Sequence, residues 1–191
     1  MSLIPPFEIG LWNAWIFMML FLVLPQLSLN LAYKRVLKRW DVDVPRKRSE
    51  KRAGRILPVA TLVSILYSFV LPLQLGTTWF YAGLSICVLA LVVNTMIPVS
   101  NAATPPNEPF TKGPYRYSRH PHYLTQFLIF IGTAVACTSW TLLLCAVAFM
   151  ILVRILVISE ERFCLQKYGE VYREYMNKTP RWIGVSKPEK N

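Results

Sequence analysis

The segment WTLLLCAVAFMILVRILVI, residues 140–158, decides the fold of this chain. Arg154 is its one charged residue, and its length matches the roughly 20 residues that cross the hydrocarbon core of a bilayer as a helix. A second run, WFYAGLSICVLALVVNTMIPV at residues 79–99, contains no charged residue. Two such runs predict a protein whose helices are embedded in a membrane.

The charged residues are distributed as in a membrane protein. Of the 191 residues, 54% are hydrophobic and 16% are charged, whereas a soluble domain carries about a quarter charged residues. The charges cluster in residues 34–55, in residues 112–119 and after Arg154. The net charge of +11 therefore comes from Lys and Arg that flank apolar runs, which is the membrane pattern, and we predict no nucleic-acid partner.

Five apolar segments predict an all-α integral membrane protein with a single domain over residues 1–191. The Pro-rich stretch 101–121 cannot form a long helix. Gly132 and Ala136 form a pair of small residues that favours close helix packing. The fourth and fifth spans are expected to form a helical hairpin. The predicted spans are residues 11–33, 56–75, 79–99, 123–137 and 140–158.

After Ser159 the pattern changes to that of an amphipathic helix, expected to lie on the membrane surface or to fold back on the bundle. Apolar and aromatic residues recur there at spacings of three and four, with charges between them. They are Leu165, Tyr168, Tyr172, Tyr175 and Met176.

The positions of Lys and Arg predict the orientation of the spans. The basic loop 34–55 is expected to be cytoplasmic, which places the N-terminus outside. With five spans, the Pro-rich loop 101–121 and the tail after Ser159 are also cytoplasmic. The remaining loops, residues 74–78 and 138–139, contain no Lys or Arg, as expected for outside loops.

The Pro-rich loop ends in GPYRYSRHPHY, residues 113–123, which places cationic, aromatic and imidazole groups at the mouth of a predicted span. Irregular backbone at a membrane surface leaves N–H and C=O groups available to a ligand, and ionisable groups there indicate a functional site. In the alternative interpretation, Arg116 and Arg119 bind lipid phosphates and the tyrosines form an aromatic belt.

The two histidines of this loop, His120 and His122, are not predicted to bind a metal. Pro121 restricts the backbone between them, and no cluster of cysteines or carboxylates completes a coordination shell.

A second group of ionisable residues lies near the end of the fifth span and consists of Arg154, Glu160 and Glu161. Adjacent acids at a membrane edge often form only the solvated start of a surface segment. The predicted orientation, however, places them on the same side as residues 113–123. The two groups are therefore expected to meet.

The order of these motifs resembles the isoprenylcysteine carboxyl methyltransferase superfamily, which includes phospholipid methyltransferases and short prokaryotic relatives. The resemblance covers about residues 105–184. It rests on GPY at 113–115, RHPHY at 119–123, the hairpin, the Glu160–Glu161 pair and YGEVYREY at 168–175. It implies an integral membrane methyltransferase that uses S-adenosylmethionine, with its catalytic half at about residues 101–184.

The resemblance also implies that the methyl donor binds between the Arg-His-Pro loop and the C-terminal segment. Arg119, Arg154 and Glu160 are the predicted catalytic residues. Asn107 and Leu156 stand where the carboxyl methyltransferases of the superfamily have a His and a substrate-contacting Arg, so the acceptor is not fixed. The implied donor contacts are Tyr115, His120, Pro121, His122, Tyr123 and Glu160.

The chemistry of methyl transfer is compatible with these residues. The reaction is an in-line displacement, in which positioning supplies much of the catalysis. The rings of Tyr115 and Tyr123 can hold the cationic sulfonium, and Arg119 or Arg181 can pair with the carboxylate of the donor. A carboxylate acceptor is already ionised at neutral pH, whereas an amine or thiol needs a proton acceptor such as His120 or Glu161.

The sequence therefore predicts a methyltransferase that acts on a lipophilic or small acceptor, as isoprenylcysteine carboxyl methyltransferases do. The acceptor enters from the bilayer and the donor from the cytoplasm. Phospholipid N-methylation and thiol methylation are alternatives within this class. From other classes, a non-enzymatic lipid-binding membrane subunit and a nicotinamide-dependent membrane reductase of related architecture remain open.

Overall fold

The computed structural model describes residues 10–25, 46–105 and 107–184, and over these residues the protein is all-helical, as predicted. The described part contains six α-helices, a π-helix and a short 3-10 helix, and its one isolated β-bridge joins Asn13 to Pro72. The elements are α1 (Trp15–Phe17), the π-helix η1 (Met18–Val23), α3 (Arg48–Ser68), α4 (Thr78–Ala102), the 3-10 helix η3 (Gly113–Arg116), α5 (Pro121–Ala136), α6 (Trp140–Tyr168) and α7 (Glu170–Lys178).

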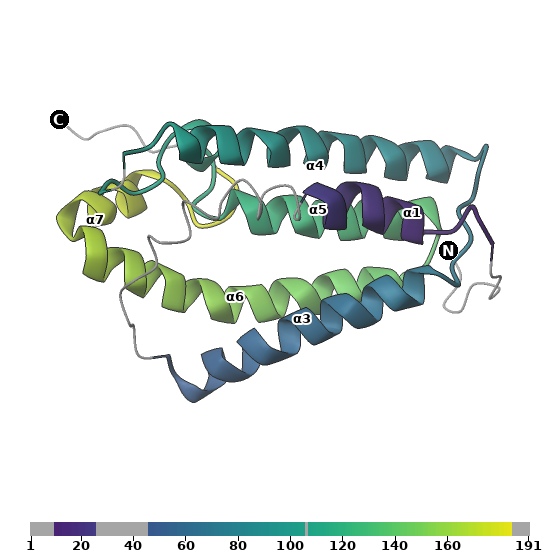
Figure 1. Ribbon diagram of the computed structural model, residues 1–191, viewed down its shortest axis with the longest axis horizontal. Helices are drawn as coiled ribbons and strands as arrows, with labels where there is room; N and C mark the ends of the chain where they lie inside the picture. The colour runs from purple at the N-terminus through teal and green to yellow at the C-terminus, as the bar shows by residue number, and fades with distance from the viewer. Residues whose placement is uncertain (1–9, 26–45, 106, 185–191) are drawn as a thin grey trace.

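The four longest helices run side by side along the long axis of the molecule (Figure 1). The helix α5 lies between α4 and α6, and α3 packs along α6. The short helices α1 and η1 cover α5, and α7 folds over at the far end of α6 (Figure 1). This order brings the N-terminus of α5 and the last turns of α6 to the same end of the bundle.

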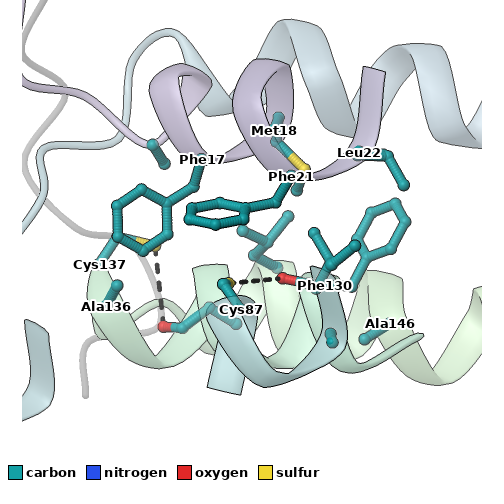
Figure 2. Packing of buried hydrophobic residues seen from close by; sticks show 14 of the residues in the cluster. Phe17, Met18, Phe21, Leu22, Cys87, Phe130, Ala136, Cys137 and Ala146 are labelled. Carbon is teal, nitrogen blue, oxygen red and sulfur yellow. Dashed lines mark hydrogen bonds between the residues drawn. The ribbon is translucent and has the colours of Figure 1, made fainter. Parts of the chain in front are cut away.

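The core lies where α1 and η1 meet the hairpin of α5 and α6 (Figure 2). Phe17, Met18 and Phe21 lie in one buried cluster with Phe130 of α5 and Ala146 of α6. The cluster joins the start of the chain to the hairpin, and buried Thr133 lies beside its member Cys87.

The closest approach between helices is made by small residues of α4 and α5. A Cβ added to Gly83 would lie 2.6 Å from Ala136 N, and one added to Gly132 would lie 2.6 Å from Cys87 Sγ. Gly132 and Ala136 thus serve the close packing that their spacing predicts.

Among the described residues, two helices, α4 and α6, are long and apolar enough to cross a membrane. Only 28% of the most apolar window of each is buried within the protein, so most of that surface is left for lipid. The helix α3 also exposes large apolar side chains at spacings of three and four, at Val59, Leu62, Val63 and Leu66. The arrangement with five spans stays a prediction, and residues 26–33 of the first span lie outside the described residues.

Two helix boundaries differ from the expected segments at the start of the chain. The first helix begins at Trp15 and not at residue 11, and α3 occupies Arg48–Ser68 whereas the predicted span is 56–75. The segment after Ser68 leaves the helix because its backbone pairs with the segment before α1: Ala14 N–H donates to Leu71 O at 2.8 Å. Pro72, which has no N–H, favours the same break.

The helix α6 does not end at residue 158 but continues through the acidic pair to Tyr168. It stops at Gly169, whose φ of +57° is a backbone conformation that glycine adopts most easily. The predicted amphipathic helix is therefore divided between the end of α6 and α7. Tyr172 and Tyr175 of α7 are buried, so α7 folds back on the bundle.

Candidate active site

Backbone hydrogen bonds join the Arg-His-Pro loop to residues 179–184, which follow α7 and are called the tail below. Arg119 N–H donates to Pro180 O at 3.1 Å, and Gly184 N–H donates to Tyr117 O at 3.2 Å. Ser118 Oγ accepts the N–H of His120 at 3.1 Å. The loop is thereby held against the tail just before Pro121 starts α5, a first-turn position that suits proline.

Glu161 of α6 is the centre of a buried ion-pair cluster. Its Oε1 lies 3.3 Å from Arg119 Nη2 and 3.3 Å from His120 Nε2. Arg181 donates to both carboxylate oxygens, with Nε at 3.0 Å from Oε1 and Nη2 at 2.5 Å from Oε2. The Glu161 side chain is only 5% exposed, so the loop, α6 and the tail meet at this carboxylate.

Glu160, the preceding residue, has a more open environment. Tyr123 donates its hydroxyl to Glu160 Oε1 at 2.6 Å, and His120 Nδ1 lies 3.5 Å from Oε2. The Glu160 side chain is 26% exposed. Of the two adjacent carboxylates, Glu160 is the one that an incoming ligand can reach.

His120 connects the two acids, since its two ring nitrogens face Glu160 and Glu161 respectively. An ionised carboxylate only accepts hydrogen bonds, so the doubly protonated imidazolium satisfies both contacts. Burial acts to lower the pKa of His120, but the hydrogen bonds and charges of the two carboxylates outweigh burial and raise the pKa above its ordinary value. The hydrogen bonds from Arg181 to Glu161 likewise raise the pKa of that guanidinium.

His122 belongs to a separate polar group between α4 and α5. Its Nδ1 lies 3.2 Å from Asn94 Oδ1, and its Nε2 lies 3.0 Å from Gln126 Nε2. Thr125 donates its hydroxyl to Asn94 Oδ1 at 3.0 Å. The structure therefore directs the two histidines to different partners, one to the acids of α6 and the other to α4.

Tyr115 packs among aromatic residues, and Arg154 lies on α6 before the acidic pair. Tyr115 stacks at a tilt on Phe110 with ring centroids 5.8 Å apart, and its carbonyl accepts the hydroxyl of Tyr175 at 2.7 Å. Arg154 is exposed on α6, six positions before Glu160. Six helical positions separate residues by about 9 Å along the axis and place them on different faces.

Sequence reasoning did not find three of the residues around the cluster. Trp182 lies beside His120 with ring centroids 6.1 Å apart. Glu50 of α3 and Arg162 of α6 form an ion pair at 2.6 Å. Trp182 directly follows Arg181 in the sequence TPRW, residues 179–182, and this neighbour could have marked it as a residue of the site. Nothing in the local sequence distinguishes Glu50 from the charged residues around it.

One comparison with known proteins gives a match. Residues 79–171, from the first turn of α4 into α7, match the model of the phospholipid methyltransferase family. This segment is similar to that family. Neither the comparison with curated proteins nor that with solved structures gives a match.

The matched segment includes nearly all of α4, together with η3, α5 and α6, and hence His120, Tyr123, Glu160 and Glu161. The resemblance seen in the motifs is confirmed by this match. The family indicates a membrane methyltransferase, and the apolar helices agree with association with a membrane. The match leaves out α1, α3 and Arg181.

Proposed function

We propose that this protein transfers a methyl group from S-adenosylmethionine to a lipophilic or small acceptor at the cluster around Glu160 and Glu161. The observation that carries the proposal is the convergence of Arg119, His120 and Tyr123 with this acidic pair. The family match independently supports methyl transfer.

The residues of the cluster fit the charged groups of the donor. Arg119 has a side chain that is 9% exposed, and its Nε is a buried donor without an acceptor among the described residues. Buried polar groups normally have partners, so this N–H is available for an anionic group such as the carboxylate of the donor. Arg181, which is 34% exposed, lies beside it on the same carboxylate.

Glu160 and Tyr123 supply complementary contacts in this proposal. The partly exposed carboxylate of Glu160 can bind the ammonium or the ribose of the donor, and the ring of Tyr123 can face its cationic sulfonium. When bound, S-adenosylmethionine supplies an electrophilic methyl group. Tyr115, Pro121 and His122 remain proposed donor contacts, and Arg154 is proposed to act on the acceptor from the exposed face of α6.

The acceptor decides whether a proton must move. A carboxylate such as that of an isoprenylated cysteine requires no base, whereas a phospholipid amine or a thiol does. Although burial lowers the pKa of His120, the two carboxylates raise it above its ordinary value, which favours the charged form and disfavours a role as proton acceptor. Glu160 is then the stronger candidate base, and phospholipid N-methylation is the alternative that the family match favours.

We further propose five spans with the N-terminus outside and the site on the cytoplasmic side. The exposed apolar faces of α3, α4 and α6 support several lipid contacts. A lipophilic acceptor then reaches the site from the bilayer while the soluble donor arrives from the cytoplasm.

The proposal is tested with purified full-length protein in detergent and S-adenosylhomocysteine, the product form of the donor. A ligand at 100 times its Kd stabilises the folded state by about 2.7 kcal/mol, so the midpoint of thermal unfolding should rise. Glu160→Gln should abolish this rise, and Glu174→Gln, which changes an exposed carboxylate of α7, should preserve it.

Radiolabelled S-adenosylmethionine with membrane lipid extract then identifies the acceptor. Label should appear in a lipid or lipophilic product with the wild type and not with Glu160→Gln. Stabilisation by a nicotinamide dinucleotide in place of S-adenosylhomocysteine would favour the reductase. Stabilisation by lipid alone, without labelled product, would favour a lipid-binding subunit.

A further inference from the structure

The ion pair between Glu50 and Arg162 joins the site to a helix outside the family-matched segment. Glu50 lies in the first turn of α3 and is 2% exposed, and Arg162 directly follows Glu161 on α6. Arg162 Nη2 donates to Glu50 Oε2 at 2.6 Å. The proposed chemistry does not use Glu50, whose carboxylate is directed to Arg162.

The same carboxylate oxygen also fixes the start of α3. Lys47 N–H donates to Glu50 Oε2 at 2.8 Å, as in a capping box in which the residue at the third helical position bonds back to the cap. Glu50 is therefore held by its own helix and is not free to follow Arg162. The ion pair attaches α6 to a fixed point on α3.

Three successive residues of α6 have partners in three different segments, although His120 also contacts both acids. Glu160 contacts Tyr123 of α5, Glu161 contacts Arg119 and the tail, and Arg162 contacts α3. Successive helical residues point about 100° apart, so the three contacts surround the helix. Together they define the rotation of α6 about its axis, and with it the direction of the Glu160 side chain.

We propose that Glu50 and Arg162 are positioning residues that hold α6 in the rotation required for Glu160 to meet the methyl donor. The role of α3 is then to orient the acidic pair. The donor contact in this inference depends on the proposed function, while the restraint on α6 does not. A displacement of about 1 Å can cost about 100-fold in catalysis, which makes such a restraint functionally important.

The experiment uses Glu50→Gln, Arg162→Gln and the double variant of the full-length protein. A glutamine at position 50 retains an acceptor for the capping bond and removes the charge. Donor-product affinity should fall about 10-fold or more in each single variant. The double variant should be no weaker than the weaker single, because its two changes remove one shared interaction.

Hydrogen exchange across the last turns of α6 supplies a readout that does not require activity. Both single variants should lose protection there while retaining helical content. Arg162→Lys, which keeps the charge, should recover part of the affinity and serves as the reporter if a glutamine variant does not fold. The matched control is Glu170→Gln with Arg173→Gln, an exposed pair 3.6 Å apart that should have no effect.

Unchanged exchange in α6, or a lowered unfolding temperature with donor-product affinity within twofold of the wild type, would overturn the inference. Failure of the wild type to bind S-adenosylhomocysteine would instead refute the proposed function. In that case, exchange in α6 still decides whether the pair restrains the helix.

Discussion

At the scale of single residues, the two adjacent acids of α6 differ in surroundings and therefore in expected role. Glu161 is 5% exposed and contacts Arg119, His120 and Arg181, so its charge is used within the protein. Glu160 is 26% exposed and contacts the neutral hydroxyl of Tyr123 and the ring of His120. The first is suited to hold the fold together and the second to meet a ligand.

Substitutions of the two acids should separate these roles. Glu161→Ala leaves the buried Arg119 without its carboxylate, and removing one partner of a buried ion pair costs about 3–5 kcal/mol. Glu160→Gln should cost much less in stability and abolish binding of S-adenosylhomocysteine. Thermal unfolding with and without this ligand measures both effects. Equal stability of the two variants would contradict the assignment.

His120 should make stability depend on pH. The two carboxylates raise its pKa above the ordinary value of 6.5, so the folded state holds a proton more tightly than the unfolded state. This contribution is fully present below pH 6.5 and is lost as pH rises through the higher pKa of the folded state. His120→Gln should reduce the fall of the unfolding midpoint across that window. An identical pH profile in the variant would show that another group is responsible.

At the scale of elements, the contact between α4 and α5 depends on small residues. Gly83 faces the backbone of α5, where a Cβ would lie 2.6 Å from Ala136 N. The backbone cannot move aside as a flexible side chain can, so even one methyl group requires the two helices to separate. This contact positions Asn94 against His122 further along the same pair of helices.

Gly83→Ala should therefore destabilise the protein by about 1–3 kcal/mol, the usual cost of overpacking. Gly54→Ala is the matched control, because the added Cβ would lie 3.6 Å from Leu156 Cδ2, an ordinary contact. This control should be neutral or stabilising by up to about 1 kcal/mol, since alanine favours helix. The unfolding midpoints of both variants test the prediction. Equal midpoints would show that α4 can move away from α5 without cost.

At the scale of the whole molecule, the site lies at one end of the bundle, where α3 begins, α5 begins and α6 ends (Figure 1). The exposed basic residues Arg48, Lys51, Arg52 and Arg55 of α3 belong to the same end. Lys and Arg concentrate in cytoplasmic loops, so the proposed orientation places this end in the cytoplasm.

Fusion of reporters to the C-terminus should reveal this orientation in a bacterial host. Green fluorescent protein should fluoresce at that position, and alkaline phosphatase, which needs the periplasm, should be inactive. The opposite pattern would reverse the proposed topology and place the site outside. A fusion after α4, in the loop before η3, should give the same result as the C-terminal one.

The sequence by itself determined the helical class, the close packing through Gly132 and Ala136, and the resemblance to the phospholipid methyltransferase family, because apolar run length, residue size and motif order are local properties. It also predicted correctly that the Arg-His-Pro loop and the acids of α6 meet, because the predicted orientation of the spans places both on the same side. It missed the continuation of α6 to Tyr168, which ends at Gly169, and the break after Ser68, where backbone pairing with the segment before α1 acts together with Pro72. Only the tertiary structure separated Glu160 from Glu161, turned His122 towards α4 and joined Glu50 to Arg162. These are contacts between residues far apart in the chain, and no periodicity within a helix specifies which charged neighbour becomes buried.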